Sequence, residues 1–131
     1  MIKIVIYGNP ITKKNNQQIC YKNAGYKRVP FIIQSKQYRA YEKAFLQSYM
    51  INYSKQLEGI VISDAINLKC IYYMQTKRKV DLVNLLEATQ DCLVKCGIIA
   101  DDNSTIIKSV NGSEVLYDKE NPRCEIYIEK I

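Results

Sequence analysis

The sequence predicts an α+β fold in which a mixed β-sheet packs against two main helices. Residues 65–75 alternate apolar and polar side chains, the pattern of a strand with one buried face. Apolar residues recur at helical spacing over about residues 36–56 and again over about residues 82–96. Because strands precede, separate and follow these helices, the element order is that of an α+β protein. The length of 131 residues predicts a single domain over residues 1–131.

A strand, a loop and a hairpin are expected before the first helix. Residues 3–7 predict a strand, which the Gly-Asn-Pro sequence at 8–10 ends. Residues 11–18 are polar and basic, which indicates a loop. Residues 19–22 and 29–34 are expected to pair as a hairpin across residues 23–25.

Both helices carry start signals and separate apolar from polar residues. Ser35 and Asp81 are expected as N-caps, and Gly97 as the end signal of the second helix. The first helix is expected to bury Tyr38, Tyr41, Ala44, Phe45, Tyr49 and Leu57. The second is expected to bury Leu85, Ala88, Cys92, Leu93 and Cys96, with Asn84, Glu87, Asp91 and Lys95 as its polar stripe.

Two closing strands are expected after the second helix. Residues 105–117 and 124–129 have the composition of strands around a turn at 118–122. Asn111 and Gly112 interrupt the first of them, as a bulge or a small hairpin would. The pairing direction of the strands does not follow from the sequence.

Composition excludes several classes of protein. Histidine is absent, and the five cysteines form no Cys-x-x-Cys pair. The usual zinc sites, His-dependent triads and His-dependent nucleases are therefore excluded, and the thiols are expected to be reduced and structural. Polar residues interrupt every apolar run, so we expect no membrane partner, no secretory signal and an intracellular protein. Any catalysis depends on carboxylates, lysines and a metal.

Charge is unevenly distributed along the chain. Residues 1–79 carry 14 Lys and Arg against 3 acids, whereas residues 80–131 carry 5 against 10. A basic half beside an acidic half is the pattern of a protein that binds phosphate next to a metal site. Surface lysines that only keep the protein in solution are the alternative.

Acidic residues concentrate between residues 77 and 104, where the chain has Asp81, Glu87, Asp91, Asp101 and Asp102. Clustered carboxylates repel one another and are usually tolerated where a divalent cation binds among them. Asp81 starts the second helix and Asp101 follows its end, roughly 22 Å along the axis. They meet only if residues 98–100 turn back along the helix. On spacing alone, a plain helix cap at Asp81 and a plain turn at 101–104 stay equally open.

The same segment combines several motifs in one register. A basic triplet (Lys77, Arg78 and Lys79) is followed by Asp-Leu-Val-Asn-Leu from Asp81, by Asp-Cys-Leu from Asp91, and by Gly-Ile-Ile-Ala-Asp-Asp from Gly97. In this order and spacing, the segment resembles the RusA family of Holliday-junction resolvases. Weaker similarity extends over most of the chain, including Pro10 and the Asn-rich loop after it.

The resemblance implies a RusA-like fold and a homodimeric, cytoplasmic, Mg²⁺-dependent endonuclease that resolves four-way DNA junctions in recombination and repair. Mn²⁺ is the alternative metal. Asp81, Asp101 and Asp102 are the implied metal ligands, and Asp91 is a further catalytic acid. The implied DNA contacts are Lys13, Lys14, Asn15, Asn16, Lys77, Arg78, Lys79 and Asn84.

Two residues depart from the family pattern. Val83 replaces an aspartate and Glu87 replaces a lysine. Because positions 83 and 87 share a helix face, we hypothesise that Glu87 supplies the missing metal-binding and catalytic carboxylate. Lys79 or Lys95 would then take the role of the family lysine that Glu87 replaces.

Two groups of tyrosines are expected to differ in role. Those at 38, 41, 49, 72 and 73 are expected in the core, with the hydroxyl reaching water. Tyr21 and Tyr26 lie on the basic hairpin, where either core packing or stacking on unpaired bases is open.

Two other functions remain as alternatives. If Val83 and Glu87 silence the site, the protein is a catalytically impaired binder of branched or single-stranded DNA. If the acidic patch instead docks a basic protein, no salt-sensitive DNA affinity is expected.

Overall fold

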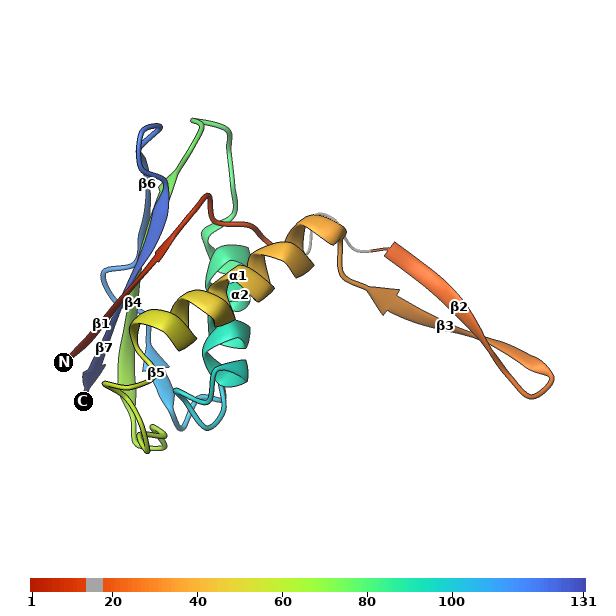
Figure 1. The fold of residues 1–131 in the computed structure, drawn as a ribbon, viewed down its shortest axis with the longest axis horizontal. Coiled ribbons are helices and arrows are strands. Elements are labelled where there is room, and N and C mark those ends of the chain that lie inside the picture. Colours follow the sequence, from red (N-terminus) through yellow and green to blue (C-terminus); the bar gives the residue numbers. More distant parts are fainter. Residues whose placement is uncertain (14–17) are drawn as a thin grey trace.

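The computed structural model describes residues 1–13 and 18–131 and confirms an α+β architecture with a mixed sheet and two helices. Lys14, Asn15 and Asn16 lie outside the described residues. In chain order the elements are β1 (Ile2–Tyr7), β2 (Gln18–Ala24), β3 (Lys27–Ile33), α1 (Lys36–Asn52), β4 (Ile66–Met74), α2 (Leu82–Lys95), β5 (Ile107–Ser109), β6 (Glu114–Tyr117) and β7 (Arg123–Lys130) (Figure 1).

The main sheet has five strands. Its order is β1–β7–β4, and both β5 and β6 pair with the remaining edge of β4. The β1–β7 and β7–β4 pairs are antiparallel, whereas β5 and β6 run parallel to β4. Asn111 and Gly112 lie between β5 and β6, so the interruption read from the sequence divides one expected strand into two short ones.

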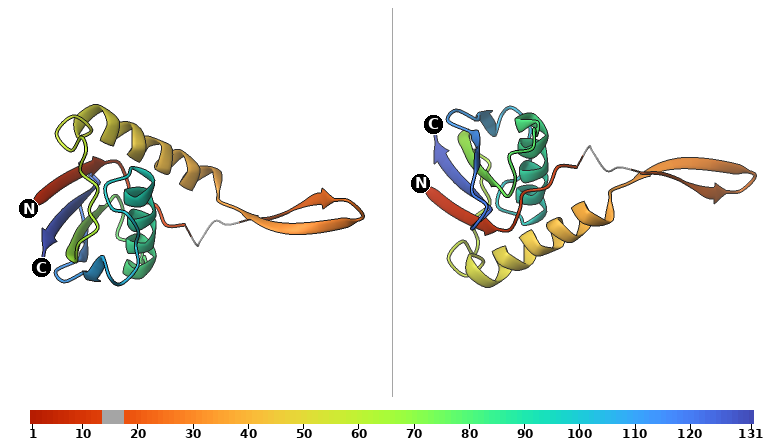
Figure 2. Two further views of the ribbon diagram at one scale, coloured as in Figure 1. Left: turned by 90° about the horizontal axis from the view of Figure 1, so that it is seen from below. Right: turned by 90° about the horizontal axis from the view of Figure 1, so that it is seen from above.

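Both helices cover the same side of this sheet (Figure 2). The alternation expected for β4 is confirmed, because Ile66, Leu68, Cys70 and Tyr72 are all buried while the residues between them are half-buried. The second helix contributes Leu85, Ala88, Cys92 and Leu93 to the core, and the first contributes Tyr38, Phe45 and Tyr49. In the described part of the chain, no helix is long and apolar enough to cross a membrane.

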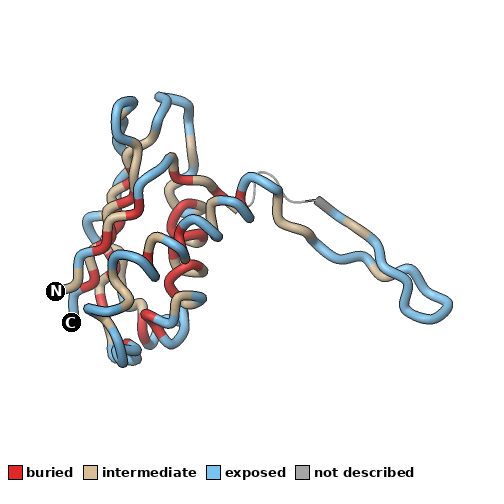
Figure 3. Tube along the Cα trace, in the orientation of Figure 1, coloured by how far each residue is buried: buried red, intermediate tan, exposed pale blue. Residues whose placement is uncertain are grey.

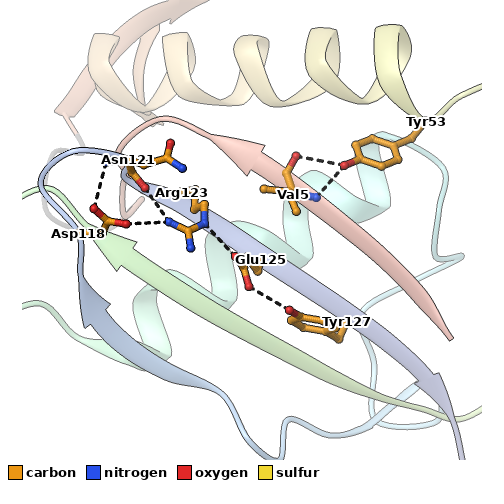
Figure 4. Close-up of polar contacts among 7 residues, drawn as sticks. All are labelled: Val5, Tyr53, Asp118, Asn121, Arg123, Glu125 and Tyr127. Atoms are coloured by element: carbon orange, nitrogen blue, oxygen red, sulfur yellow. Dashed lines mark hydrogen bonds and ion pairs between the residues drawn. The ribbon is translucent and has the colours of Figure 1, made fainter.

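The first helix ends earlier than expected, at Asn52, and leaves Ala44 exposed. Tyr53 leaves helical geometry and turns its side chain to the outer edge of the sheet (Figure 4). Its hydroxyl accepts a hydrogen bond from the Val5 backbone N–H at 3.0 Å and lies 3.5 Å from the Val5 carbonyl oxygen. This contact occupies edge-strand backbone groups that could otherwise pair with another strand.

The face of the sheet away from the helices carries a polar network around Arg123 (Figure 4). Its guanidinium donates to Asp118 Oδ2 at 3.0 Å and to Glu125 Oε2 at 2.8 Å, and lies 3.8 Å from the centre of the Tyr73 ring. Tyr127 donates to the other oxygen of Glu125 at 2.9 Å. The hydrogen bond from Arg123 lowers the pKa of Asp118.

A hairpin extends away from the body of the protein (Figure 1). It consists of β2, a turn at Gly25 and Tyr26, and β3, and is called the arm below. The expected hairpin is confirmed, with longer strands and a later turn. Its two strands form a sheet of their own, and residues 19–33 are exposed or half-buried (Figure 3).

Candidate functional site

Asp81 is the N-cap of α2, as expected from the sequence. Its carboxylate accepts a hydrogen bond from the Val83 backbone N–H at 3.0 Å. The side chain is exposed, and the positive end of the helix dipole stabilises its charge. One carboxylate is therefore presented to solvent at the start of the helix.

The basic triplet lies in the link between β4 and α2, and Val80 separates it from Asp81. Lys77, Arg78 and Lys79 are all exposed. Arg78 and Lys79 line a cavity of about 630 Å³ together with residues 9–12 and the first turn of α1. Lys77 Nζ lies 5.1 Å from the centre of the Tyr117 ring. This end of α2 thus combines positive charge with a concave surface, which fits a polyanion. The triplet and Asp81 are called the N-terminal group.

Lys13 forms an ion pair with Asp91, which lies in the second half of α2. Lys13 Nζ is 2.6 Å from Asp91 Oδ2, and 24% and 25% of their side-chain surfaces are exposed. The hydrogen bond to Asp91 raises the pKa of Lys13, and the negative charges of Glu87 and Glu42 raise it further. The sequence predicted Lys13 as a DNA contact, whereas the structure places its ammonium among three carboxylates.

Asp101 and Asp102 occupy an exposed loop after α2. Asp101 accepts hydrogen bonds from the Asn103 amide at 2.9 Å and from the Asp102 backbone N–H at 2.8 Å, and these lower its pKa. Partial desolvation and the nearby charges of Asp101 and Asp91 raise the pKa of Asp102. Asp102 and Asp91 therefore lie close enough to repel each other, and are called the C-terminal group.

The two groups lie at opposite ends of α2. The helix has 14 residues, or about 21 Å at 1.5 Å per residue. Residues 98–100 do not return along the helix, because the Ile98 carbonyl and the Ala100 N–H both bond to the backbone of Ile62, each at 2.9 Å. Among residues 1–13 and 18–131, no three acidic or cysteine side chains come close enough to hold a metal ion. One chain therefore does not bring Asp81 and Asp102 together.

The remaining expected residues lie along α2. Val83 is 67% exposed, while Asn84 and Glu87 are half-buried. Lys95 pairs with Glu42 at 2.8 Å, so its ammonium is directed toward α1. Sequence reasoning missed Glu42, whose place beside Lys13 and Lys95 depends on the packing of α1 against α2.

Asp102→Asn and Asp101→Asn are expected to shift thermal stability in opposite directions at pH 7. The pKa of Asp102 is raised, so ionisation of this carboxyl group lowers the stability of the fold once the pH rises above 3.8, the ordinary pKa of an aspartate. The pKa of Asp101 is lowered, so its negative charge stabilises the fold above pH 3.8, and this stabilisation is lost as the pH falls below that value. Asp102→Asn should therefore raise Tm slightly and Asp101→Asn should lower it. Melting curves from pH 3 to 7 test this, and shifts of the same sign would contradict it.

The chain was compared with known protein families and with curated protein sequences. A family model described as Endodeoxyribonuclease RusA matches residues 7–129, a range that contains both groups and the arm. No curated protein sequence matches the chain.

Proposed function

Because the chain belongs to the RusA family of endodeoxyribonucleases, we propose that it is a cytoplasmic, structure-selective nuclease that resolves four-way DNA junctions in recombination and repair. The observation that carries this proposal is the exposed basic triplet, which one residue separates from the exposed Asp81 carboxylate. Cations at this position would hold a DNA phosphate next to a group that binds metal.

The carboxylates of both groups fit a hard divalent cation in donor chemistry. Mg²⁺ prefers oxygen ligands, with Mn²⁺ as the alternative. Desolvation, together with the charges of Asp101 and Asp91, raises the pKa of Asp102, and an added cation would relieve the repulsion among these carboxylates. Since no three acidic side chains among the described residues of one chain lie close enough to hold a metal ion, Asp102 with Asp101, Asp91 or Glu87 would hold it only together with Asp81 of a second chain. When bound, such an ion lowers the pKa of water and neutralises charge on the scissile phosphate.

We propose that the functional unit is a homodimer in which the N-terminal group of one chain meets the C-terminal group of the other. Support comes from the length of α2, which separates Asp81 from Asp102 within one chain. In addition, paired incisions on a two-fold symmetric junction need two sites related by the same symmetry.

The basic residues divide into two proposed roles. Lys77, Arg78 and Lys79 bind DNA phosphates, and Asn84 orients the same strand. The family resemblance implies DNA contacts for Lys14, Asn15 and Asn16 as well. Lys13 instead takes the role of the lysine that Glu87 replaces, since its ammonium already contacts Asp91. Lys95 forms an ion pair with Glu42, so it is the weaker candidate for the role of that lysine.

Glu87→Gln is expected to slow Mg²⁺-dependent cleavage by roughly 10- to 100-fold, because it removes the carboxylate that compensates for Val83. Val83→Asp is the matched variant, because it restores a carboxylate one turn earlier on the same helix face. Combined with Glu87→Gln, it should recover much of the lost cleavage rate. Single-turnover cleavage rates check both. Wild-type rates in Glu87→Gln would show that Glu87 has no part in the reaction.

The experiment that tests the proposed function is incision of a labelled four-way junction and of a linear duplex with the same arm sequence. Cuts should be specific to the junction, should require Mg²⁺ or Mn²⁺, and should stop with chelator. Tight junction binding without cuts would instead indicate a DNA-binding protein with a silenced site. Absence of salt-sensitive binding would support the interaction protein and reject the nuclease.

A further inference from the structure

The arm exposes apolar side chains that the body of the protein does not cover. Ile19 is 67% exposed, Ile32 61%, and Tyr21 56%. A two-stranded hairpin is at best marginally stable alone in water, so such residues indicate a surface that functions with a partner.

The register of the arm places an aromatic and cationic surface near its tip. Tyr21 is opposite Pro30, and Arg28 is opposite Asn23 on the same face. The Arg28 guanidinium lies 4.9 Å from the centre of the Tyr21 ring, which holds this cation in place. Lys22 and Lys27 occupy the other face near the tip.

The turn presents Tyr26 at the end of the arm. Gly25 has a φ of +65° and Tyr26 does not have a positive φ, as a two-residue turn with Gly in its first position requires. Tyr26 is fully exposed, at 108% of the reference area. Its ring therefore has both faces open to a planar ligand.

Charge identifies the partner. The chain has no acidic residue before Glu42, and eight of its lysines and arginines precede it. The arm carries Lys22, Lys27 and Arg28 with no compensating acid, so a second arm would be repelled. Phosphates neutralise these cations, and exposed bases stack on tyrosine rings whatever their sequence.

We propose that the arm is a second DNA-binding element, which binds unpaired bases through Tyr26 and Tyr21 and the adjoining phosphates through Lys22, Lys27 and Arg28. With strands of seven residues, the arm reaches roughly 20 Å beyond the body. It therefore contacts nucleotides distant from the phosphate at the candidate site. This inference rests on the proposed nuclease function, and extends it to recognition of the branch point.

The test compares binding of a four-way junction, a duplex with an unpaired bubble and a fully paired duplex. Tyr26→Ala should weaken binding of the first two by about 5- to 150-fold and of paired duplex much less, while Tyr26→Phe should bind as wild type does. Lys22→Gln with Lys27→Gln should reduce the slope of log K against log salt by about 1.8. The matched control, Lys55→Gln with Lys130→Gln, removes two exposed charges outside the arm, one after α1 and one at the end of β7, and should leave the slope unchanged.

Three outcomes would overturn the inference or its premise. If wild-type protein binds and cuts junctions and the arm variants equal it, the arm does not bind DNA. If light scattering shows that the arm variants are monomers while the wild-type protein is a dimer, and this alone explains their lower affinity, the arm is an interface between two copies. If wild-type protein binds no DNA at all, the proposed function itself fails.

Discussion

Asp81→Asn is expected to reduce metal-dependent junction cleavage by roughly 10²- to 10⁴-fold while leaving junction affinity nearly unchanged. Asparagine is as good an N-cap as aspartate, so the start of α2 should be retained. What the substitution removes is the negative oxygen that we propose binds the cation beside the basic triplet. The phosphate contacts proposed for Lys77, Arg78 and Lys79 do not depend on that charge.

The measurement is single-turnover cleavage of a labelled four-way junction, with binding measured in Ca²⁺ or chelator. Asp81→Ala provides the structural comparison, because it removes the cap as well as the charge and should cost about 0.5–2 kcal/mol of stability. Asp81→Asn should instead melt close to wild type. Unchanged cleavage in Asp81→Asn would leave Asp81 with only its capping role.

Mixing Asp81→Asn subunits with Asp102→Asn subunits is expected to restore cleavage that neither variant shows alone. If each site takes Asp81 from one chain and Asp102 from the other, a mixed dimer has one intact site and one doubly substituted site. With random assortment, about a quarter of all sites are intact, and most products are single nicks rather than paired incisions.

The comparison that decides this is the mixture against each variant alone at the same total concentration, after co-refolding or co-expression. If both carboxylates of a site came from one chain, every site would carry one substitution and the mixture would stay inactive. Recovery of nicking would support the homodimer and explain why α2 separates the two groups within one chain.

The elements that sequence reasoning predicted well are those governed by local periodicity. The alternation of residues 65–75 became β4, and the spaced apolar residues after Asp81 became the buried face of α2. Capping is equally local, since the Asp81 carboxylate bonds to the N–H two residues further on. The arm was also predicted, because turn residues and β-forming residues act over a few positions.

Only the tertiary structure decided which distant residues meet. Lys13 and Asp91 are 78 residues apart, and their ion pair depends on where the N-terminal segment lies against α2. The parallel pairing of β5 and β6 with β4 depends on the path of the chain after Ala100. The candidate acids were thus determined by the sequence, because charge and spacing belong to each residue. Their separation into two groups was determined by packing, because a 14-residue helix is rigid and the segment after it pairs with Ile62 instead of returning to Asp81.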